Sequence, residues 1–310
     1  MKTKCLPGFI VGRAVIALVL MSVANSMHAQ RIEPRAYINA PVGVNIFALG
    51  YVNSQGALLF DPSLPITDAD ANVDMAMLAY VRTLDIAGLS GKVGVIQPYA
   101  SLKADGYLNT EYRTRDQIGV ADTALYFSIN FHGAPALSLK DFKNYKQDTI
   151  VGFTFRITMP TGVYQPEKLL NIGTNRWSFE PELGISKAIG QWTLEAAAAV
   201  VFYTDNDEVD TDQTRTQDPI YSAQFHVNYT FTNKMWVSLG TTYYTGGITT
   251  IDGFERDDLQ NNWRTGFTLA IPIDRRHSIK LLGNSGVSTR TGNDYDSLGL
   301  FWQYRWGGGI

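Results

Sequence analysis

The chain has 310 residues, of which 45% are hydrophobic, 18% charged and 12% aromatic, and its formal net charge is −3. This hydrophobic content excludes intrinsic disorder. The charge content is below the roughly 25% of a typical soluble domain. The near-neutral charge leaves no electrostatic footprint for nucleic acid, so we expect no nucleic-acid partner. A mean hydropathy of −0.09 also argues against a bundle of membrane helices.

The N-terminal residues have the features of a signal peptide. Three basic residues precede an apolar run over 14–24, which is too short to span a bilayer but has the length of a secretory hydrophobic region. Small residues then offer a cleavage site after Ala29. We therefore predict a signal peptide over 1–29, with an N-terminal membrane anchor as the alternative. The one cysteine, Cys5, lies in this segment, so the mature chain is expected to have no disulfide.

The rest of the chain alternates apolar residues with polar or small ones, as β-strands with one apolar face do. From Tyr221 to Phe231, for example, every odd position is apolar or aromatic and every even position is polar. Such segments have about the nine to eleven residues that a tilted crossing of a bilayer requires. We predict twelve strands, over 43–53, 72–84, 92–102, 119–131, 150–159, 177–187, 191–203, 220–231, 235–245, 262–272, 277–284 and 297–306.

The connections between these strands favour a membrane barrel over a secreted soluble β-protein. Outer-membrane barrels alternate short periplasmic turns with long external loops. Here the second, sixth, eighth and tenth connections are short, and the odd-numbered ones are long. The fourth connection, 133–149, departs from this alternation. Either it holds a small amphipathic periplasmic helix, or the strand count is off by a pair.

The predicted fold class is therefore all-β, a transmembrane antiparallel β-barrel of about twelve strands. The barrel is expected over 43–306, after a periplasmic N-terminal tail over 30–42, with a C-terminal tail over 307–310. Five tryptophans fall at predicted strand ends, where amphipathic rings prefer the headgroup level: Trp177, Trp192, Trp236, Trp263 and Trp306. This fold predicts a location in the cell outer membrane, with membrane lipid, lipopolysaccharide and the barrel-assembly machinery as partners.

Charged and polar residues gather on the predicted inward faces of the central strands. They are Arg156, Arg176, Glu180, Glu182, Glu195, Gln224 and His226. Because neighbouring strands lie about 4.8 Å apart, these side chains are expected to share one sector of the lumen. They either line a path that selects a permeating solute or form a salt-bridge network that fills a narrow interior.

Two prolines interrupt predicted strands. Pro98 and Pro181 each remove a donor from the hydrogen-bond ladder, and each therefore predicts a local break in the barrel wall. Such a break could open sideways and let an apolar solute leave into the membrane. A simple bulge that adjusts the curvature of the wall is the alternative.

The sequence offers no pattern for a cofactor, a metal or a catalytic site. The acidic stretch 205–212 lacks the glycine and the final glutamate of a calcium-binding EF-hand loop. Ser222 and His226 share a predicted inward face, but such residues are ordinary in a lumen. We therefore expect no enzyme, and a lipid hydrolase of the outer membrane is the least favoured function.

The segment 159–184, with its Pro160-Thr-Gly and Glu180-Pro-Glu motifs, resembles a family of bacterial outer-membrane proteins named for the meta-pathway of phenol degradation. Further similar stretches are 202–207, 217–223, 244–247, 288–292 and 302–306. The resemblance implies a channel or transporter for passive uptake of small hydrophobic or aromatic compounds. The alternative is a structural or surface-interaction barrel without transport.

Overall fold

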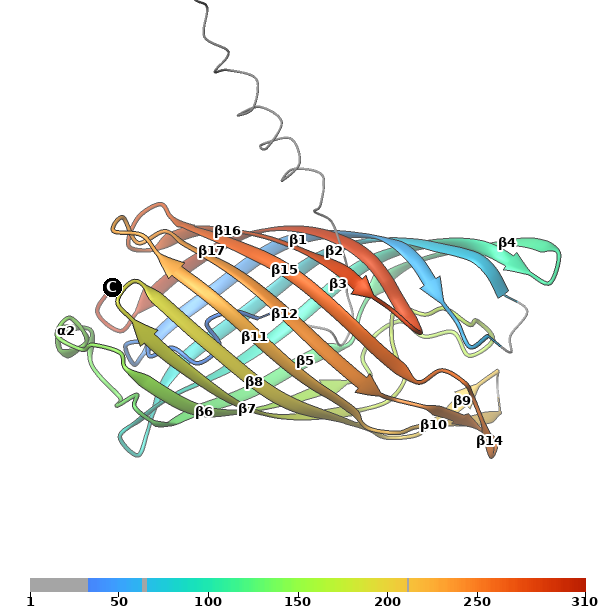
Figure 1. Ribbon diagram of the computed structural model, residues 1–310, viewed down its shortest axis with the longest axis horizontal. Helices are drawn as coiled ribbons and strands as arrows, with labels where there is room; N and C mark the ends of the chain where they lie inside the picture. The colour runs from blue at the N-terminus through green and yellow to red at the C-terminus, as the bar shows by residue number, and fades with distance from the viewer. Residues whose placement is uncertain (1–32, 63–65, 211) are drawn as a thin grey trace, which may run out of the picture.

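The computed structural model describes residues 33–62, 66–210 and 212–310 (Figure 1). Its long strands are β1 (Val44–Leu59), β2 (Ile66–Ile86), β3 (Leu89–Leu108), β5 (Thr123–His132), β6 (Thr149–Met159), β7 (Ser178–Ile189), β8 (Trp192–Tyr203), β11 (Ile220–Thr230), β12 (Trp236–Gly246), β15 (Gln260–Pro272), β16 (His277–Ser288) and β17 (Gly292–Gly307). These twelve antiparallel strands close into a barrel, because β1 pairs with β2 on one edge and with β17 on the other. The predicted twelve-stranded barrel is thus confirmed. The predicted signal peptide, 1–29, lies outside the described residues.

The two ends of the barrel differ (Figure 1). The remaining elements are α2 (Leu139–Phe142), β4 (Glu111–Val120), β9 (Asn206–Val209), β10 (Gln213–Gln217), β13 (Thr249–Ile251) and β14 (Phe254–Glu255). The helix α2 lies at the same end as the C-terminus, whereas β4, β9, β10 and β14 lie at the other end. Because outer-membrane barrels keep short turns on the periplasmic side and long loops outside, we assign the β4 end to the outside. In the described part of the chain, no helix is long and apolar enough to cross a membrane.

Side chains alternate between the outer face of the barrel and its lumen, as the period of two predicts. In β7, Leu183 and Ile185 are 57% and 45% exposed, whereas Glu182 and Ser186, on the opposite face of the strand, are buried. Exposing apolar side chains to water costs roughly 25 cal/mol per Å². An outer face of this composition is therefore suited to the hydrocarbon of a bilayer rather than to water.

The first strands are longer than predicted. β2 and β3 pair from Ile86 and Leu89 to Ile66 and Leu108, so most of the expected long loops on either side of them are strand hairpins. Their outward faces become polar toward the outside: the Asn53 amide donates to Asn72 and to Asp74, each at 2.9 Å. The alternation of apolar and polar residues ends there because this part of the outer face lies beyond the hydrocarbon of the bilayer. The hydrogen-bond ladder of the backbone continues.

The fourth connection contains the short helix that its apolar residues suggested. Ser138 caps α2, since its hydroxyl accepts a hydrogen bond from the Asp141 amide at 3.3 Å. Within the segment, the Tyr145 hydroxyl donates to the Gly133 carbonyl at 2.6 Å, and the Gln147 side-chain amide contacts the barrel by donating to the Ser186 hydroxyl of β7 at 3.0 Å. No strand of the barrel is added or lost here within the described residues, so the count of twelve stands.

Four of the five tryptophans point outward at strand ends, and one does not. Trp177, Trp192, Trp263 and Trp306 are 37–50% exposed on the outer face. Trp236 instead lies in the lumen, with the guanidinium carbon of Arg35 5.0 Å and the Lys280 ammonium 5.9 Å from its ring centre. For Trp236 the interface expectation is wrong, because the register of β12 turns its even positions inward.

Candidate functional site: the barrel lumen

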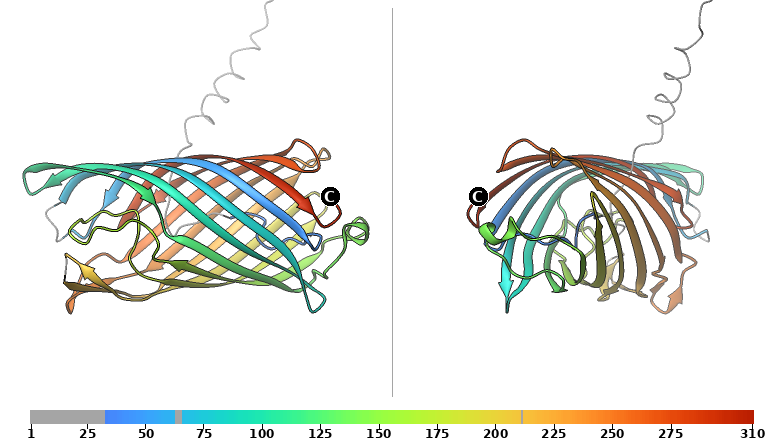
Figure 2. Two further views of the ribbon diagram at one scale, coloured as in Figure 1. Left: turned by 180° about the vertical axis from the view of Figure 1, so that it is seen from behind. Right: turned by 60° about the vertical axis from the view of Figure 1, so that its left-hand side comes forward.

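Residues 33–43 run inside the barrel toward the first strand (Figure 2). They are the described part of the expected tail 30–42. Tyr37 is their most buried side chain, at 1% exposed. Its hydroxyl bonds to Thr154 Oγ1 at 3.1 Å and donates to Glu182 Oε1 at 2.8 Å. The N-terminal segment is therefore held against the inner wall formed by β6 and β7.

Two glycines form the recess that receives the Tyr37 ring. A β-carbon on Gly184 would lie 1.9 Å from Tyr37 Cε2, and one on Gly152 would lie 2.5 Å from Cδ1. Both glycines occupy inward positions on neighbouring strands, and Ala197 on the next strand packs against the same cluster. Any larger residue at 152 or 184 would displace the ring, so the wall of the lumen is shaped to bind this tyrosine.

A second anchor of the N-terminal segment is Arg35. Its backbone amide donates to Glu195 Oε2 at 2.5 Å, and its guanidinium donates to Thr230 Oγ1 at 3.2 Å. Glu195 is buried and also accepts a hydrogen bond from the Asn228 amide at 3.0 Å. A buried carboxylate is stable only when such partners replace its hydration. The N-terminal segment therefore provides part of the hydrogen bonding that replaces water around the Glu195 carboxylate.

Six of the seven predicted lumen residues lie in one polar network around the N-terminal segment. Arg156 lies 3.7 Å from Glu33 and 3.9 Å from Glu180. Gln224 donates to Glu182 at 2.8 Å and its Oε1 lies 3.0 Å from His226 Nε2. Glu195, which accepts the Arg35 backbone amide, is the sixth member. The structure thus brings together one arginine, three glutamates, one amide and one imidazole. Their role along a solute path stays a prediction.

The seventh residue, Arg176, lies apart from this network. It precedes β7 at the external end, where its guanidinium donates to Gln217 Oε1 on β10. Burial, together with the positive charge of the neighbouring Arg215, lowers the pKa of Arg176 to about 10. Within the described residues, no group of three or more His, Cys, Asp and Glu side chains could hold a metal ion.

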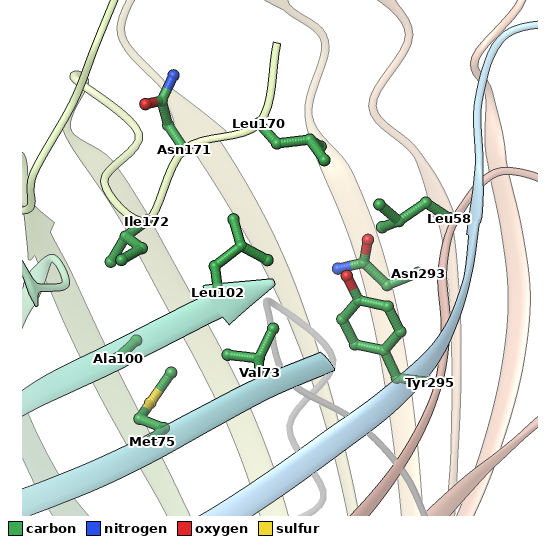
Figure 3. A pocket seen from close by; sticks show the side chains of 10 residues that line it. All are labelled: Leu58, Val73, Met75, Ala100, Leu102, Leu170, Asn171, Ile172, Asn293 and Tyr295. Atoms are coloured by element: carbon green, nitrogen blue, oxygen red, sulfur yellow. The ribbon is translucent and has the colours of Figure 1, made fainter. Parts of the chain in front are cut away.

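The external half of the lumen holds an apolar cavity that the sequence analysis did not predict (Figure 3). The cavity has a volume of about 100 Å³. Its lining comes from the inner faces of β1, β2, β3 and β17 and from the loop that follows β6: Leu58, Val73, Met75, Ala100, Leu102, Leu170, Asn171, Ile172, Asn293 and Tyr295. A signal for it was present, because β2 carries apolar residues on both faces between Met75 and Val81.

The loop over 160–177 closes one side of this cavity. The Asp122 carboxylate accepts hydrogen bonds from Gly162 N and Thr174 N, both at 2.8 Å, and from the Thr174 hydroxyl at 2.6 Å. Gln117 Oε1 accepts the Ile172 amide at 2.8 Å. These bonds place Ile172 in the apolar cluster, so the position of the loop determines the shape of the cavity.

The barrel wall is interrupted beside this loop. β3 pairs with β5 as far as Ile96 and with β4 from Tyr99 onward, so Pro98 lies opposite the break between β4 and β5. The Ala121 amide still donates to the Pro98 carbonyl at 3.0 Å. Along its other edge β4 pairs with no strand of the described chain, and the loop takes that place through Val163, whose amide donates to Val120 at 2.9 Å. The fourth strand, predicted over 119–131, is thus divided into β4 and β5.

The second proline has a smaller effect on the wall. The ladder between β7 and β8 omits Glu180 and Pro181, but the ladder between β6 and β7 runs through both without a shift. Pro181 therefore interrupts pairing on one edge only, and the strands on both sides remain in register.

A closed antiparallel barrel with an apolar outer face defines this chain as an outer-membrane β-barrel protein. Residues 53–304 match the family described as "Putative MetA-pathway of phenol degradation", and the chain belongs to that family. The resemblance found in segment 159–184 is therefore confirmed. No curated protein sequence shows significant similarity to the chain.

Solved structures share the barrel fold. An outer membrane channel from Pseudomonas putida F1 aligns with a TM-score of 0.76 at 21% identity, over 89% of this chain and 100% of that chain. The transport unit of the autotransporter AIDA-I from Escherichia coli aligns with a TM-score of 0.50 at 11% identity, over 94% of this chain and 97% of that chain. At these identities the likeness concerns the fold.

Proposed function

We propose that this protein is an outer-membrane channel for passive uptake of small hydrophobic or aromatic compounds. The observation that carries the proposal is the apolar cavity inside the barrel (Figure 3). An engineered apolar cavity of about 150 Å³ in another protein stays dry and binds benzene. A cavity of about 100 Å³ with the loop over 160–177 as one wall is a suitable first binding site for a small apolar solute.

The route onward is proposed to be lateral. The N-terminal segment and the polar network around Glu182 and Glu195 occupy the lumen below the cavity, and an apolar solute would gain nothing from entering them. The break beside Pro98 offers another exit. Its outward neighbours Tyr99 and Val120 are 49% and 40% exposed, so the outer surface at that height is apolar. These features favour release into the bilayer over release into the periplasm.

The family supports the same substrate class, since its description names phenol degradation. Two of the described histidines have partners other than a serine: His226 Nε2 is bonded to Gln224, and His277 Nδ1 accepts the Trp302 indole at 3.2 Å. Within the described residues, neither ring is hydrogen-bonded to a serine that could act as a nucleophile.

Uptake of labelled toluene by a deletion strain that carries plasmid-encoded variants would test the proposal. Leu102→Asp places a charge in the cavity and is expected to lower uptake at least fivefold. Leu108→Asp is the matched control, because Leu108 is 41% exposed at the end of the same strand and lies outside the cavity. Equal uptake by wild type, the Leu102 variant and the empty strain would reject the proposal.

Exchange of Pro98 for valine tests the lateral exit separately. Valine can donate to the ladder, so it removes the local reason for the break. Unchanged toluene uptake by Pro98→Val, in a protein that still shows the heat-dependent gel mobility of a folded barrel, would reject an exit at this position.

A further inference from the structure

Two arginines lie together at the external end of the barrel without an acidic partner. Arg176 precedes β7, and Arg215 lies on β10, in the loop sheet opposite the C-terminal end in Figure 1. Both side chains are partly buried, and both lie beside Tyr203 and Tyr164. Across the described ranges, neither guanidinium has a carboxylate oxygen within the 4.0 Å of an ion pair.

Several donors of this arginine pair are unused. Arg176 donates through Nη2 to Gln217 Oε1, but its Nη1 is buried and makes no hydrogen bond with the described residues. Arg215 has a buried Nε in the same condition, and its guanidinium donates to no other described residue. A guanidinium carries five N–H donors, and leaving them unpaired away from water is unfavourable.

Asp122 and Asp258, the acids whose charges act on the two arginines, are already engaged elsewhere. Asp122 accepts the three hydrogen bonds that hold the loop over 160–177. Asp258 accepts Thr249 N at 2.8 Å and the Thr249 hydroxyl at 2.6 Å. These carboxylates attract the arginines from a distance but do not pair with them, so two neighbouring positive charges remain without a counter-ion in contact.

The surroundings of the pair add an aromatic surface. The guanidinium carbon of Arg176 lies 4.3 Å from the ring centre of Tyr203. Stacking of this kind fixes the plane of the guanidinium. The site therefore combines fixed cationic donors with an apolar face.

We propose that Arg176 and Arg215 form a binding site for an oxyanion, a carboxylate or a phosphate group, at the external end of the barrel. Guanidinium groups bind both anions through paired, charge-assisted hydrogen bonds, and two adjacent arginines supply enough donors to surround one such group. The carboxylate of an aromatic acid and free or lipid-borne phosphate are the two sources of this chemistry. The site is separate from the apolar cavity, since neither arginine lines it.

Calorimetric titration of the purified full-length protein in detergent tests the site. Benzoate and inorganic phosphate are the probes, and benzyl alcohol is the uncharged control. We expect at least one anion to bind, benzyl alcohol to bind more weakly than benzoate, and the affinity for the binding anion to fall at least tenfold in Arg176→Gln and in Arg215→Gln. The stronger of the two anions identifies the source.

Arg113→Gln is the matched control, because Arg113 lies on β4 with its guanidinium 2.7 Å from Glu111, and binding is expected to be unchanged. Arg215→Gln removes no side-chain hydrogen bond to the residues that the structure describes, so it is expected to fold, which heat-dependent gel mobility verifies. Absence of binding by both anions, or equal binding by wild type and both arginine variants, would overturn the proposal. Since the titration involves no transport, its failure is distinct from a failure of toluene uptake.

Discussion

The inner wall of this barrel has two unlike sides. Along β6, β7, β8 and β11 it carries acids and amides that bind the N-terminal segment. At the external ends of β1, β2, β3 and β17 it carries apolar side chains around a cavity. Both sides are buried, but the polar side finds its partners in the chain itself, whereas the apolar side leaves space. One sector of the lumen is thus filled by the chain itself, whereas the other leaves the space that the proposed function assigns to a solute.

Removal of the N-terminal segment is expected to have the largest effect on the polar side of the lumen. Deletion of residues 33–40 takes away Arg35, Tyr37 and their bonds to Glu182 and Glu195. Water then hydrates the exposed carboxylates, so the barrel is expected to stay folded and its single-channel conductance in planar bilayers to rise at least tenfold. A deletion variant with wild-type conductance would contradict the closing role of the polar side.

A substitution in the tyrosine recess should give a smaller effect of the same sign. Gly184→Val places carbon atoms where the Tyr37 ring lies, and the ring has to leave. We expect conductance to rise roughly two- to fivefold, with new protease sensitivity in residues 33–43. Ile185→Val is the control on the same strand, because Ile185 faces outward and is 45% exposed. If both variants behave alike, the recess does not hold the segment.

On the apolar side, a substitution that releases the loop over 160–177 is expected to have a smaller effect, on uptake. Asp122→Ala removes three hydrogen bonds, each worth about 1 kcal/mol net. The loop should then open more often, and toluene uptake should rise about two- to threefold without a change in conductance. Asp116→Ala, at an exposed position of β4, is the control. A rise in conductance instead of uptake would mean that this loop closes an aqueous path.

The smallest effect is expected in the periplasmic turn at Asp274, which belongs to neither side of the lumen. Its carboxylate accepts the amides of His277 at 2.7 Å and Arg276 at 2.6 Å, which hold the pKa of Asp274 below its ordinary value. The resulting stabilisation is present above the ordinary pKa and is lost as the pH falls through the lowered one. Hydrogen exchange of the two amides should therefore accelerate, relative to other turns, only in strongly acidic solution. Asp274→Asn should show no such pH dependence.

The outward faces of the strands could be predicted because contact with lipid requires an apolar residue at every second position. In β11, from Tyr221 to Thr230, each outward residue is apolar and each inward one is polar, so the strand, its length and its buried side could be predicted together. The inward placement of Glu182 and Glu195 follows from the same period. Their partners could not be predicted, since Tyr37 lies 145 residues from Glu182 in sequence and only closure of the barrel brings them together.

The apolar cavity was missed for a different reason. An apolar residue on a membrane strand is assigned to lipid by default, whereas Val73 and Met75 face inward and their polar neighbours Asn72 and Asp74 face outward. Apolar residues on both faces of β2 are the signal that distinguishes such a strand. The break opposite Pro98 was indicated by the proline, but the division of the fourth strand around it depends on the loop that replaces a strand beside β4.

The length of β2 shows at which heights, relative to the membrane, the cavity and the proposed exit lie. Its 21 residues, at about 3.3 Å each and a tilt of roughly 45°, rise about 50 Å, whereas the apolar belt of an outer-membrane barrel is about 25 Å tall. About half of the strand therefore stands in the sugar layer of the lipopolysaccharide. The cavity lies at the height of the polar outward residues Asn72 and Asp74, and the break at Pro98 lies below it, beside apolar ones. On the proposed route, an apolar compound would be captured among sugars and released downhill into acyl chains, with no need for a pore through the barrel axis.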